Sequence, residues 1–270
     1  MRFRILSILL VLVLVSSCGE YEKLLKSTDF ELKKQKAKEY FDAGQYVKTT
    51  EILSQILPRY RATEEAEDMN WMNAQAYFGM KDYFMAGSYF ASFVDQFPFG
   101  KYAEEANFMA AFCNYKIAPR SELDQENTKN AIEGFNIFIN RFPRSAKIDE
   151  AKKYVKELEE KLVEKSYVSA KLYYDMGEYK AAVVALTNSL KEYSETKYRE
   201  EMMFLKLNSL YLYAEKSFAL KQKERYQAAL DDYYSFMEEF PKTEYSKEVG
   251  NIFEKTNKFL KAGIADSGVK

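Results

Sequence analysis

The segment SFVDQFPFG, at residues 92–100, returns as IFINRFPRS at 137–145 and as SFMEEFPKT at 235–243. Three of the five prolines in the chain directly follow a phenylalanine in these segments, at positions 98, 143 and 241. Proline cannot continue a helix but can begin one. We therefore interpret each Phe-Pro pair as the end of one helix and the turn into the next.

The residues that precede these prolines at fixed distances are also of the same types. A small residue and three aromatic residues stand 12, 8, 5 and 1 positions earlier, and this spacing follows one face of a helix. The residues are Ala86, Phe90, Phe93 and Phe97, then Ala131, Phe135, Phe138 and Phe142, then Ala229, Tyr233, Phe236 and Phe240. Two further copies have Arg61 and Ser194 in place of the proline, so the pattern predicts five repeats.

A second helix is expected before each of these helices, because a small residue and an aromatic residue recur 24 and 21 positions before the marker. Gly44 and Gly177 lie between the two helices, where a residue with positive φ ends the first one. This order of residue types resembles the tetratricopeptide repeat. We therefore expect an all-α fold, an α-solenoid of about five tetratricopeptide-like helix pairs with a C-terminal capping helix.

The spacing also predicts the organisation of the chain. The repeats are expected at about 30–61, 63–98, 100–143, 147–194 and 196–241, followed by a cap at 243–262 and a disordered tail at 263–270. Because the spacing exceeds the usual 34 residues, helices must be lengthened or loops inserted, chiefly at 117–126 and around 214–224. Residues 147–175 contain neither proline nor glycine, which predicts one long helix.

The composition disfavours catalysis and nucleic-acid binding. The chain has 40 lysines and arginines against 41 acidic residues, without a basic segment, so no electrostatic attraction to nucleic acid is expected. Histidine is absent, which removes the commonest general base and the commonest zinc ligand. No catalytic or nucleotide-binding motif occurs. We therefore expect no enzymatic activity, no cofactor and no metal site.

The first 18 residues, MRFRILSILLVLVLVSSC, predict an export signal. Two arginines precede an apolar run of about eleven residues, too short to cross a bilayer. The last four residues of this segment, Val-Ser-Ser-Cys, resemble the bacterial lipobox, which implies a signal peptide at 1–17 and acylation of Cys18. Residues 18–29 would then be a lipidated linker, and acyl chains would hold the protein on the membrane. The alternative is a plain secretory signal that leaves an N-terminal cysteine. Cys113 is expected to be a buried thiol.

The tetratricopeptide register implies which side chains line the concave side of the repeats. They are Lys34, Lys38 and Phe41 in the first repeat, Trp71, Gln75 and Phe78 in the second, and Phe108, Phe112 and Tyr115 in the third. An aromatic groove with lysines at one end suits an extended peptide with apolar side chains and a terminal carboxylate. The alternative is that these rings pack against one another inside the protein.

Taken together, these features resemble the BamD family, the tetratricopeptide lipoprotein of the outer-membrane β-barrel assembly machine. The most specific segments are RSELDQENTKNAIEGFNIFINRFPRS at 120–145 and KLVEKSYVSAKLYYDMGEYKAAV at 161–183. Arg61 and Ser194 depart from the pattern, and the insertion before the fifth repeat is long.

The resemblance implies a scaffold on the outer membrane that faces the periplasm. Its C-terminal repeats would dock onto the β-barrel insertase, beside other lipoprotein subunits, and its N-terminal groove would receive unfolded outer-membrane proteins. Gly19, which follows the cysteine, implies the outer membrane by resemblance to the proteobacterial sorting rule. The main alternative is a periplasmic tetratricopeptide scaffold for another cell-envelope process. A carbohydrate-binding lipoprotein is disfavoured, because it would need a long loop-rich insertion.

Overall fold

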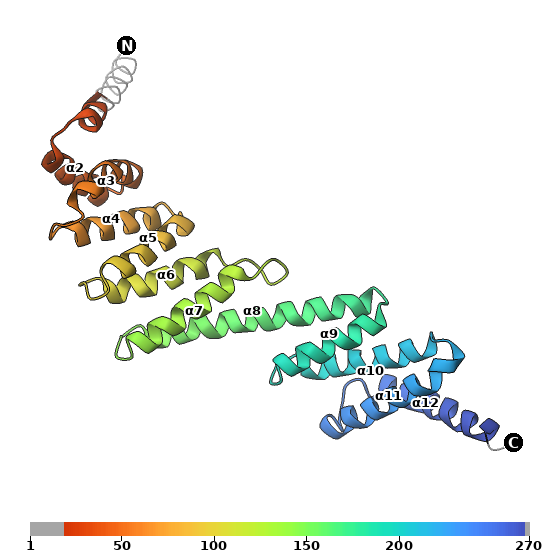
Figure 1. Cartoon of the computed structure of the whole chain (residues 1–270). Helices are drawn as coiled ribbons and strands as arrows, with labels where there is room; N and C mark the ends of the chain where they lie inside the picture. The colour runs from red at the N-terminus through yellow and green to blue at the C-terminus, as the bar shows by residue number, and fades with distance from the viewer. Residues whose placement is uncertain (1–18, 268–270) are drawn as a thin grey trace, which may run out of the picture. The chain divides into compact units, whose positions relative to one another are not determined.

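The computed structural model describes residues 19–267, and every regular element in this range is an α-helix (Figure 1). The prediction of an all-α fold built from tetratricopeptide-like helix pairs is therefore confirmed. The pairs are α2 (Phe30–Asp42) with α3 (Tyr46–Tyr60), α4 (Ala66–Gly79) with α5 (Tyr83–Gln96), α6 (Ala103–Ile117) with α7 (Glu126–Arg141), α8 (Ile148–Asp175) with α9 (Tyr179–Glu192), and α10 (Arg199–Glu215) with α11 (Ala219–Glu239), followed by α12 (Ser246–Ser267). The export segment and Cys18 lie outside the described residues.

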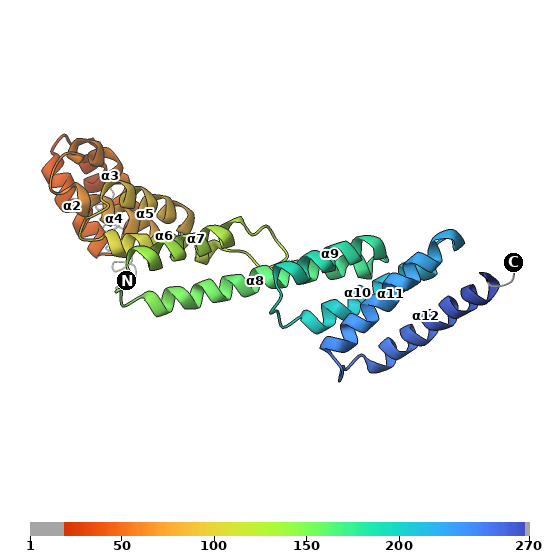
Figure 2. The ribbon, with the colours of Figure 1, turned by 60° about the horizontal axis from the view of Figure 1, so that its bottom comes forward.

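The chain divides into two compact units, and α8 contributes to both. The first unit ends at residue 158 and leaves out residues 120–124, which belong to the second unit together with residues from 159 onward. The prediction of one long helix over 147–175 is confirmed, because α8 runs without interruption from Ile148 to Asp175 (Figures 1 and 2).

The recurring alanine and aromatic positions form the core of the helix pairs. Ala86, Phe90 and Phe93 are at most 1 % exposed, and the corresponding residues of α7 are equally buried. Each alanine lets the two helices of a pair approach closely, while the aromatic rings fill the space towards the neighbouring helices. Local periodicity in the sequence thus becomes two core clusters in the first unit, one around α2 and α3 and one around α5, α6 and α7, and a single cluster in the second unit.

The Phe-Pro pairs end helices as expected. Phe97 caps α5, its N–H donates to the carbonyl of Phe93, and the two rings lie 5.0 Å apart. Phe142 and Phe240 cap α7 and α11 in the same way. However, the prolines do not begin the following helices, which start five positions later, at residues 103, 148 and 246. The proline begins a turn instead, since the chain must reverse direction before the next helix can pack.

A left-handed residue separates the helices of three pairs. Gly44 and Gly177 have φ values of 70° and 76°, which confirms the predicted role of these glycines. Lys81 takes the same position between α4 and α5 with a φ of 62°. In each case the N–H of this residue donates to a carbonyl three positions earlier, at 2.9 Å. The turn geometry is therefore shared even where the sequence lacks glycine.

Other segments differ from the sequence-based expectations. The residues inserted around 214–224 lengthen α10 and α11, and only residues 216–218 connect the two helices. Residues 19–26, expected to belong to a linker, form a helix whose Leu24 is 7 % exposed and packs against the first helix pair. At the other end, α12 continues to Ser267, beyond the expected cap.

Candidate peptide-binding site

Four of the predicted groove residues line one pocket of about 500 Å³ in the first unit, which we call the N-terminal pocket. Lys34, Lys38 and Phe41 come from α2, and Trp71 comes from α4. The other lining residues are Gln35, Asp42, Glu65, Asp68, Met69, Met72 and Tyr102. The register of the repeat thus brings together side chains that are about 30 residues apart in the sequence.

Trp71 forms a fixed wall of this pocket. Its indole stacks on the Tyr102 ring, with a centroid distance of 4.7 Å and an interplanar angle of 7°. It also lies 5.4 Å from Phe90 and 5.9 Å from Phe93, both of which belong to the core. The half-buried indole is therefore held on one side by the core and borders the N-terminal pocket with the other. The N-terminal pocket therefore has an apolar wall whose ring is held in one orientation.

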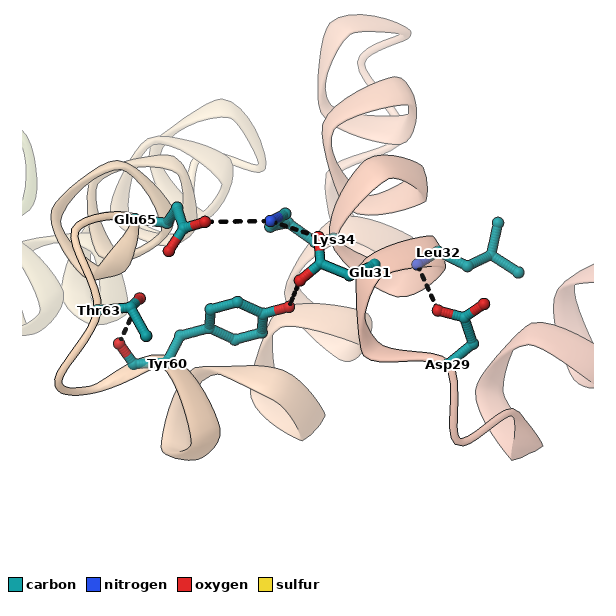
Figure 3. Close-up of polar contacts among 7 residues, drawn as sticks. All are labelled: Asp29, Glu31, Leu32, Lys34, Tyr60, Thr63 and Glu65. Atoms are coloured by element: carbon teal, nitrogen blue, oxygen red, sulfur yellow. Dashed lines mark hydrogen bonds and ion pairs between the residues drawn. The ribbon is translucent and has the colours of Figure 1, made fainter.

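Lys34 is already paired within the protein, as Figure 3 shows. Its Nζ lies 2.6 Å from a carboxylate oxygen of Glu31 and 3.3 Å from one of Glu65. The phenol of Tyr60 donates to the other oxygen of Glu31 at 2.5 Å. The hydrogen bond to Glu31 raises the pKa of Lys34, and the same bond lowers the pKa of Glu31. The expectation that Lys34 offers a free ammonium group to a ligand is therefore wrong.

Lys38 differs from Lys34, since it is exposed and has no ion-pair partner among residues 19–267. Asp68, which also lines the pocket, is paired with Lys101 at 2.6 Å, and this contact holds the pKa of its carboxyl below the usual range. Altogether two lysines and three acidic residues line the pocket. Its electrostatics are therefore mixed, and Lys38 is the lining ammonium available for a carboxylate on a ligand.

The structure places the groove residues of the third repeat in or against the core. Phe108 is 3 % exposed and lies 5.6 Å from Phe135 and 5.4 Å from Phe138. Tyr154 of α8 covers the other two rings, at 5.4 Å from Phe112 and 4.4 Å from Tyr115. The prediction that Phe108 lines an open groove is wrong, because the long helix α8 supplies an aromatic cover.

Two predicted residues of the second repeat lie outside the N-terminal pocket. Gln75 is not among its lining residues, and Phe78 packs against Tyr83 at 5.3 Å and Phe112 at 6.2 Å. Sequence reasoning also missed Met72 and Tyr102, which do line the pocket. Tyr102 follows the Phe-Pro turn of the second repeat, so its place just before α6 was the available signal.

Within the described range, no helix is both long and apolar enough to cross a membrane. The same range contains no group of three or more acidic or cysteine side chains arranged to hold a metal ion.

Most of the helix pairs, and the whole N-terminal pocket, lie in a segment of the sequence that matches a known protein family. A sequence profile for YfiO, described as an outer membrane lipoprotein, matches residues 32–224. The chain belongs to the YfiO family of outer membrane lipoproteins. YfiO and BamD denote the same family, so the resemblance found in the sequence is confirmed. In this YfiO-family chain the match extends from α2 into α11 and includes every residue of the N-terminal pocket.

Solved tetratricopeptide structures are also similar to this YfiO-family chain. The TPR2AB domain of yeast Sti1, solved in a complex with pHSP90, has a TM-score of 0.37 at 16 % identity, and the match covers 84 % of this chain and 98 % of that one. The TPR domain of P58(IPK) has a TM-score of 0.41 at 14 % identity, over 90 % and 68 % of the two chains. Neither likeness bears on function at such scores. Curated protein sequences yield no match.

Proposed function

We propose that this chain is a non-enzymatic scaffold of the outer-membrane β-barrel assembly complex, anchored through acyl chains on Cys18 and facing the periplasm. It receives unfolded outer-membrane proteins at the N-terminal pocket and docks onto the barrel insertase through its C-terminal repeats. The family match and the helical-repeat fold support the scaffold role. The observation that carries the proposal is the N-terminal pocket, in which apolar walls and one unpaired ammonium group converge.

The lining of this pocket suits one end of an extended peptide. Phe41, Met72 and Trp71 provide apolar surface for an aromatic or aliphatic side chain, and burial of such a side chain stabilises a complex by about 1.5–3 kcal/mol. Lys38 can donate to a terminal carboxylate of the same peptide. A volume of about 500 Å³ holds one or two side chains of a peptide, so most of a longer substrate would remain outside.

The second unit supports the docking role. Phe218 and Leu220, at the turn between α10 and α11, are 89 % and 96 % exposed. Two large apolar side chains exposed two positions apart in the sequence are candidates for contact with a protein partner. In the proposed function this partner is the periplasmic part of the barrel insertase.

The pocket variants Phe41→Ala and Lys38→Gln test the peptide site. The probe is a fluorescent peptide with the C-terminal sequence of an outer-membrane barrel, prepared with a terminal carboxylate or with a carboxamide. We expect Phe41→Ala to weaken binding of both peptides by about tenfold, since it removes buried apolar contact. We expect Lys38→Gln to abolish the preference for the carboxylate.

The matched controls carry the same substitutions outside the pocket. Phe84→Ala removes a ring that is 69 % exposed, and Lys129→Gln removes an exposed charge from α7. Both should bind the peptides like the parent. If Phe41→Ala and Lys38→Gln also bind like the parent, the N-terminal pocket is not the peptide site.

The role in the cell is tested by depletion and by purification. Depletion of the protein should lower the amount of folded barrels in the outer membrane, and normal barrel levels would contradict the proposal. Copurification with a β-barrel insertase from detergent extracts separates this proposal from a scaffold for another cell-envelope process. Cys18→Ala should release the protein from the membrane into the soluble periplasmic fraction.

A further inference from the structure

A second pocket in the first unit has a different chemistry. It measures about 280 Å³ and lies between α3, α4 and α5. We call it the amide pocket, and its lining residues are Thr50, Ser54, Leu57, Pro58, Arg61, Asn70, Asn73, Tyr77, Tyr89 and Gln96. None of these residues lines the N-terminal pocket. Three carboxamides, two hydroxyls, two phenols and one guanidinium group therefore surround this space, and no acidic side chain does.

The polar residues come from regular helix faces rather than from loops. On α4, Asn70, Asn73 and Tyr77 are spaced by three and four positions, which places them on one face. On α3, Thr50 and Ser54 follow the same rule. Faces that point between packed helices are usually apolar, and most inter-helix faces of this protein carry the alanines and rings of the core, with single buried polar residues such as Asn107 and Thr128 among them. A set of several polar side chains around one space is therefore unusual for this protein and is consistent with a ligand site.

Asn73 is the strongest sign of a ligand. The residue is only 3 % exposed, and its carboxamide, which makes no hydrogen bond with another described residue, reaches the space of the amide pocket. A carboxamide has two donors and an acceptor with two lone pairs. Buried polar groups in folded proteins nearly always have a partner, either in the protein or in ordered water that a ligand can displace. The unpartnered amide of Asn73 is therefore available to a molecule in the pocket.

The end of α3 contributes a carbonyl that lacks its regular helical donor. Pro58 lies in the last turn of this helix and has no N–H, so the carbonyl of Ser54 lacks the donor that a regular helix would supply. Both residues line the amide pocket. A ligand N–H or O–H can take the place of the missing donor.

Arg61 supplies the charge. It stands where three other repeats have proline, directly after α3, and is exposed. Its guanidinium group has no ion pair or hydrogen bond among residues 19–267, whereas the neighbouring Arg59 lies over the Phe30 ring at 4.6 Å. With no carboxylate in the lining, Arg61 leaves the amide pocket with a net positive charge. An anionic group is therefore attracted to it.

From these observations we infer that the amide pocket binds a small carboxylic acid that also carries hydroxyl or amide groups. In this proposal Arg61 pairs with the carboxylate. Asn73, together with the carboxamides of Asn70 and Gln96, forms hydrogen bonds with the hydroxyl or amide groups of the ligand. The stacked rings of Tyr77 and Tyr89, 4.7 Å apart, form the apolar part of the wall. A volume of about 280 Å³ lies at the small end of ligand sites and suits a group of the size of one sugar acid or two amino-acid residues.

The test uses the full chain purified in detergent micelles and labelled with nitrogen-15 at asparagine. Three probes are compared by saturation-transfer NMR: N-acetylmuramic acid, the matched neutral sugar N-acetylglucosamine, and the capped dipeptide acetyl-alanyl-alanine, which ends in a free carboxylate. We expect at least one acid to bind about tenfold or more tightly than the neutral sugar and to shift the side-chain amide signal of Asn73. Tighter binding of N-acetylmuramic acid would identify the carboxylate as that of a sugar, and tighter binding of acetyl-alanyl-alanine would identify it as that of a peptide.

Two variants and a matched control complete the experiment. Arg61→Gln is expected to abolish the preference for an acid, and Arg59→Gln, which removes the same charge two residues away and outside the lining, should retain it. Asn73→Leu should abolish binding while the chain still unfolds cooperatively in urea. The inference is overturned if no acid binds, if the neutral sugar binds equally well, or if Arg61→Gln binds acids like the parent. Because the two pockets share no residue, these outcomes are independent of peptide binding at the N-terminal pocket.

Discussion

Replacement of Phe108 by alanine distinguishes a core residue from a groove residue. The ring is 3 % exposed and has four aromatic neighbours, Phe112, Phe135, Phe138 and Tyr154, at centroid distances between 5.4 and 6.4 Å. Lys147 also lies over its face, with Nζ 4.5 Å from the centroid. If the ring lined an open groove, its removal would weaken peptide binding and leave the fold unchanged.

We expect Phe108→Ala to lower the free energy of unfolding by about 4 kcal/mol. Removal of a fully buried phenylalanine typically costs about 3–5 kcal/mol, since the apolar transfer energy is lost and a cavity remains. The expected cost lies in the upper half of this range, because the substitution also removes the close aromatic pairs and the cation over the ring, and both add to the lost free energy. With a dependence on urea of about 2 kcal/mol per molar, the midpoint of unfolding should fall by about 2 M.

Urea unfolding followed by tryptophan fluorescence measures this change. Trp71 is the only tryptophan in the chain and lies in the same unit as Phe108, so its signal reports the part of the protein that is destabilised. Phe99→Ala is the matched control, because that ring is 97 % exposed and its loss should change stability by less than about 0.5 kcal/mol. If Phe108→Ala unfolds at the same urea concentration as Phe99→Ala and binds the peptide more weakly, Phe108 lines a groove and does not belong to the core.

Two further predictions concern the turns and the buried thiol. Gly177→Ala should lower the free energy of unfolding by about 1–2 kcal/mol, because φ is 76° at this position. Gly250→Ala, inside α12 with open space around the added methyl group, should raise it by about 0.5–1 kcal/mol. Thermal unfolding measures both changes, and equal effects of the two substitutions would contradict the turn geometry. Burial raises the pKa of the Cys113 thiol to about 12, so in a Cys18→Ala chain this thiol should stay unreactive towards a thiol reagent at pH 8 and react once urea unfolds the protein. Rapid labelling of the folded chain would show that the thiol is accessible.

The helices and their core could be predicted because both depend on local sequence. The spacing of Ala86, Phe90 and Phe93 before Pro98 is a property of one helix, and the structure buries all three core residues. The turn glycines Gly44 and Gly177 were predictable for the same reason, since few other residues tolerate a positive φ. Lys81 adopts this conformation without any local signal in the sequence.

The candidate site was predictable only in part. The tetratricopeptide register placed Lys38, Phe41 and Trp71 around one space, and the structure agrees. The register could not show that Lys34 would form an ion pair with Glu65, which lies 31 residues further along the chain. The amide pocket was not predicted at all, because its polar residues are scattered over three helices and become a set only when these helices pack.

By itself, the sequence determined that this chain forms pairs of amphipathic helices with reversals at Phe-Pro pairs and at glycines, because periodicity and backbone preference act over a few residues. Tertiary structure alone decided which rings stay accessible. Phe108 and Trp71 occupy equivalent positions in consecutive repeats, yet Tyr154 of α8 helps to bury the first while the second borders a pocket. Accessibility depends on what distant residues bring to the same place, and no local pattern contains that information.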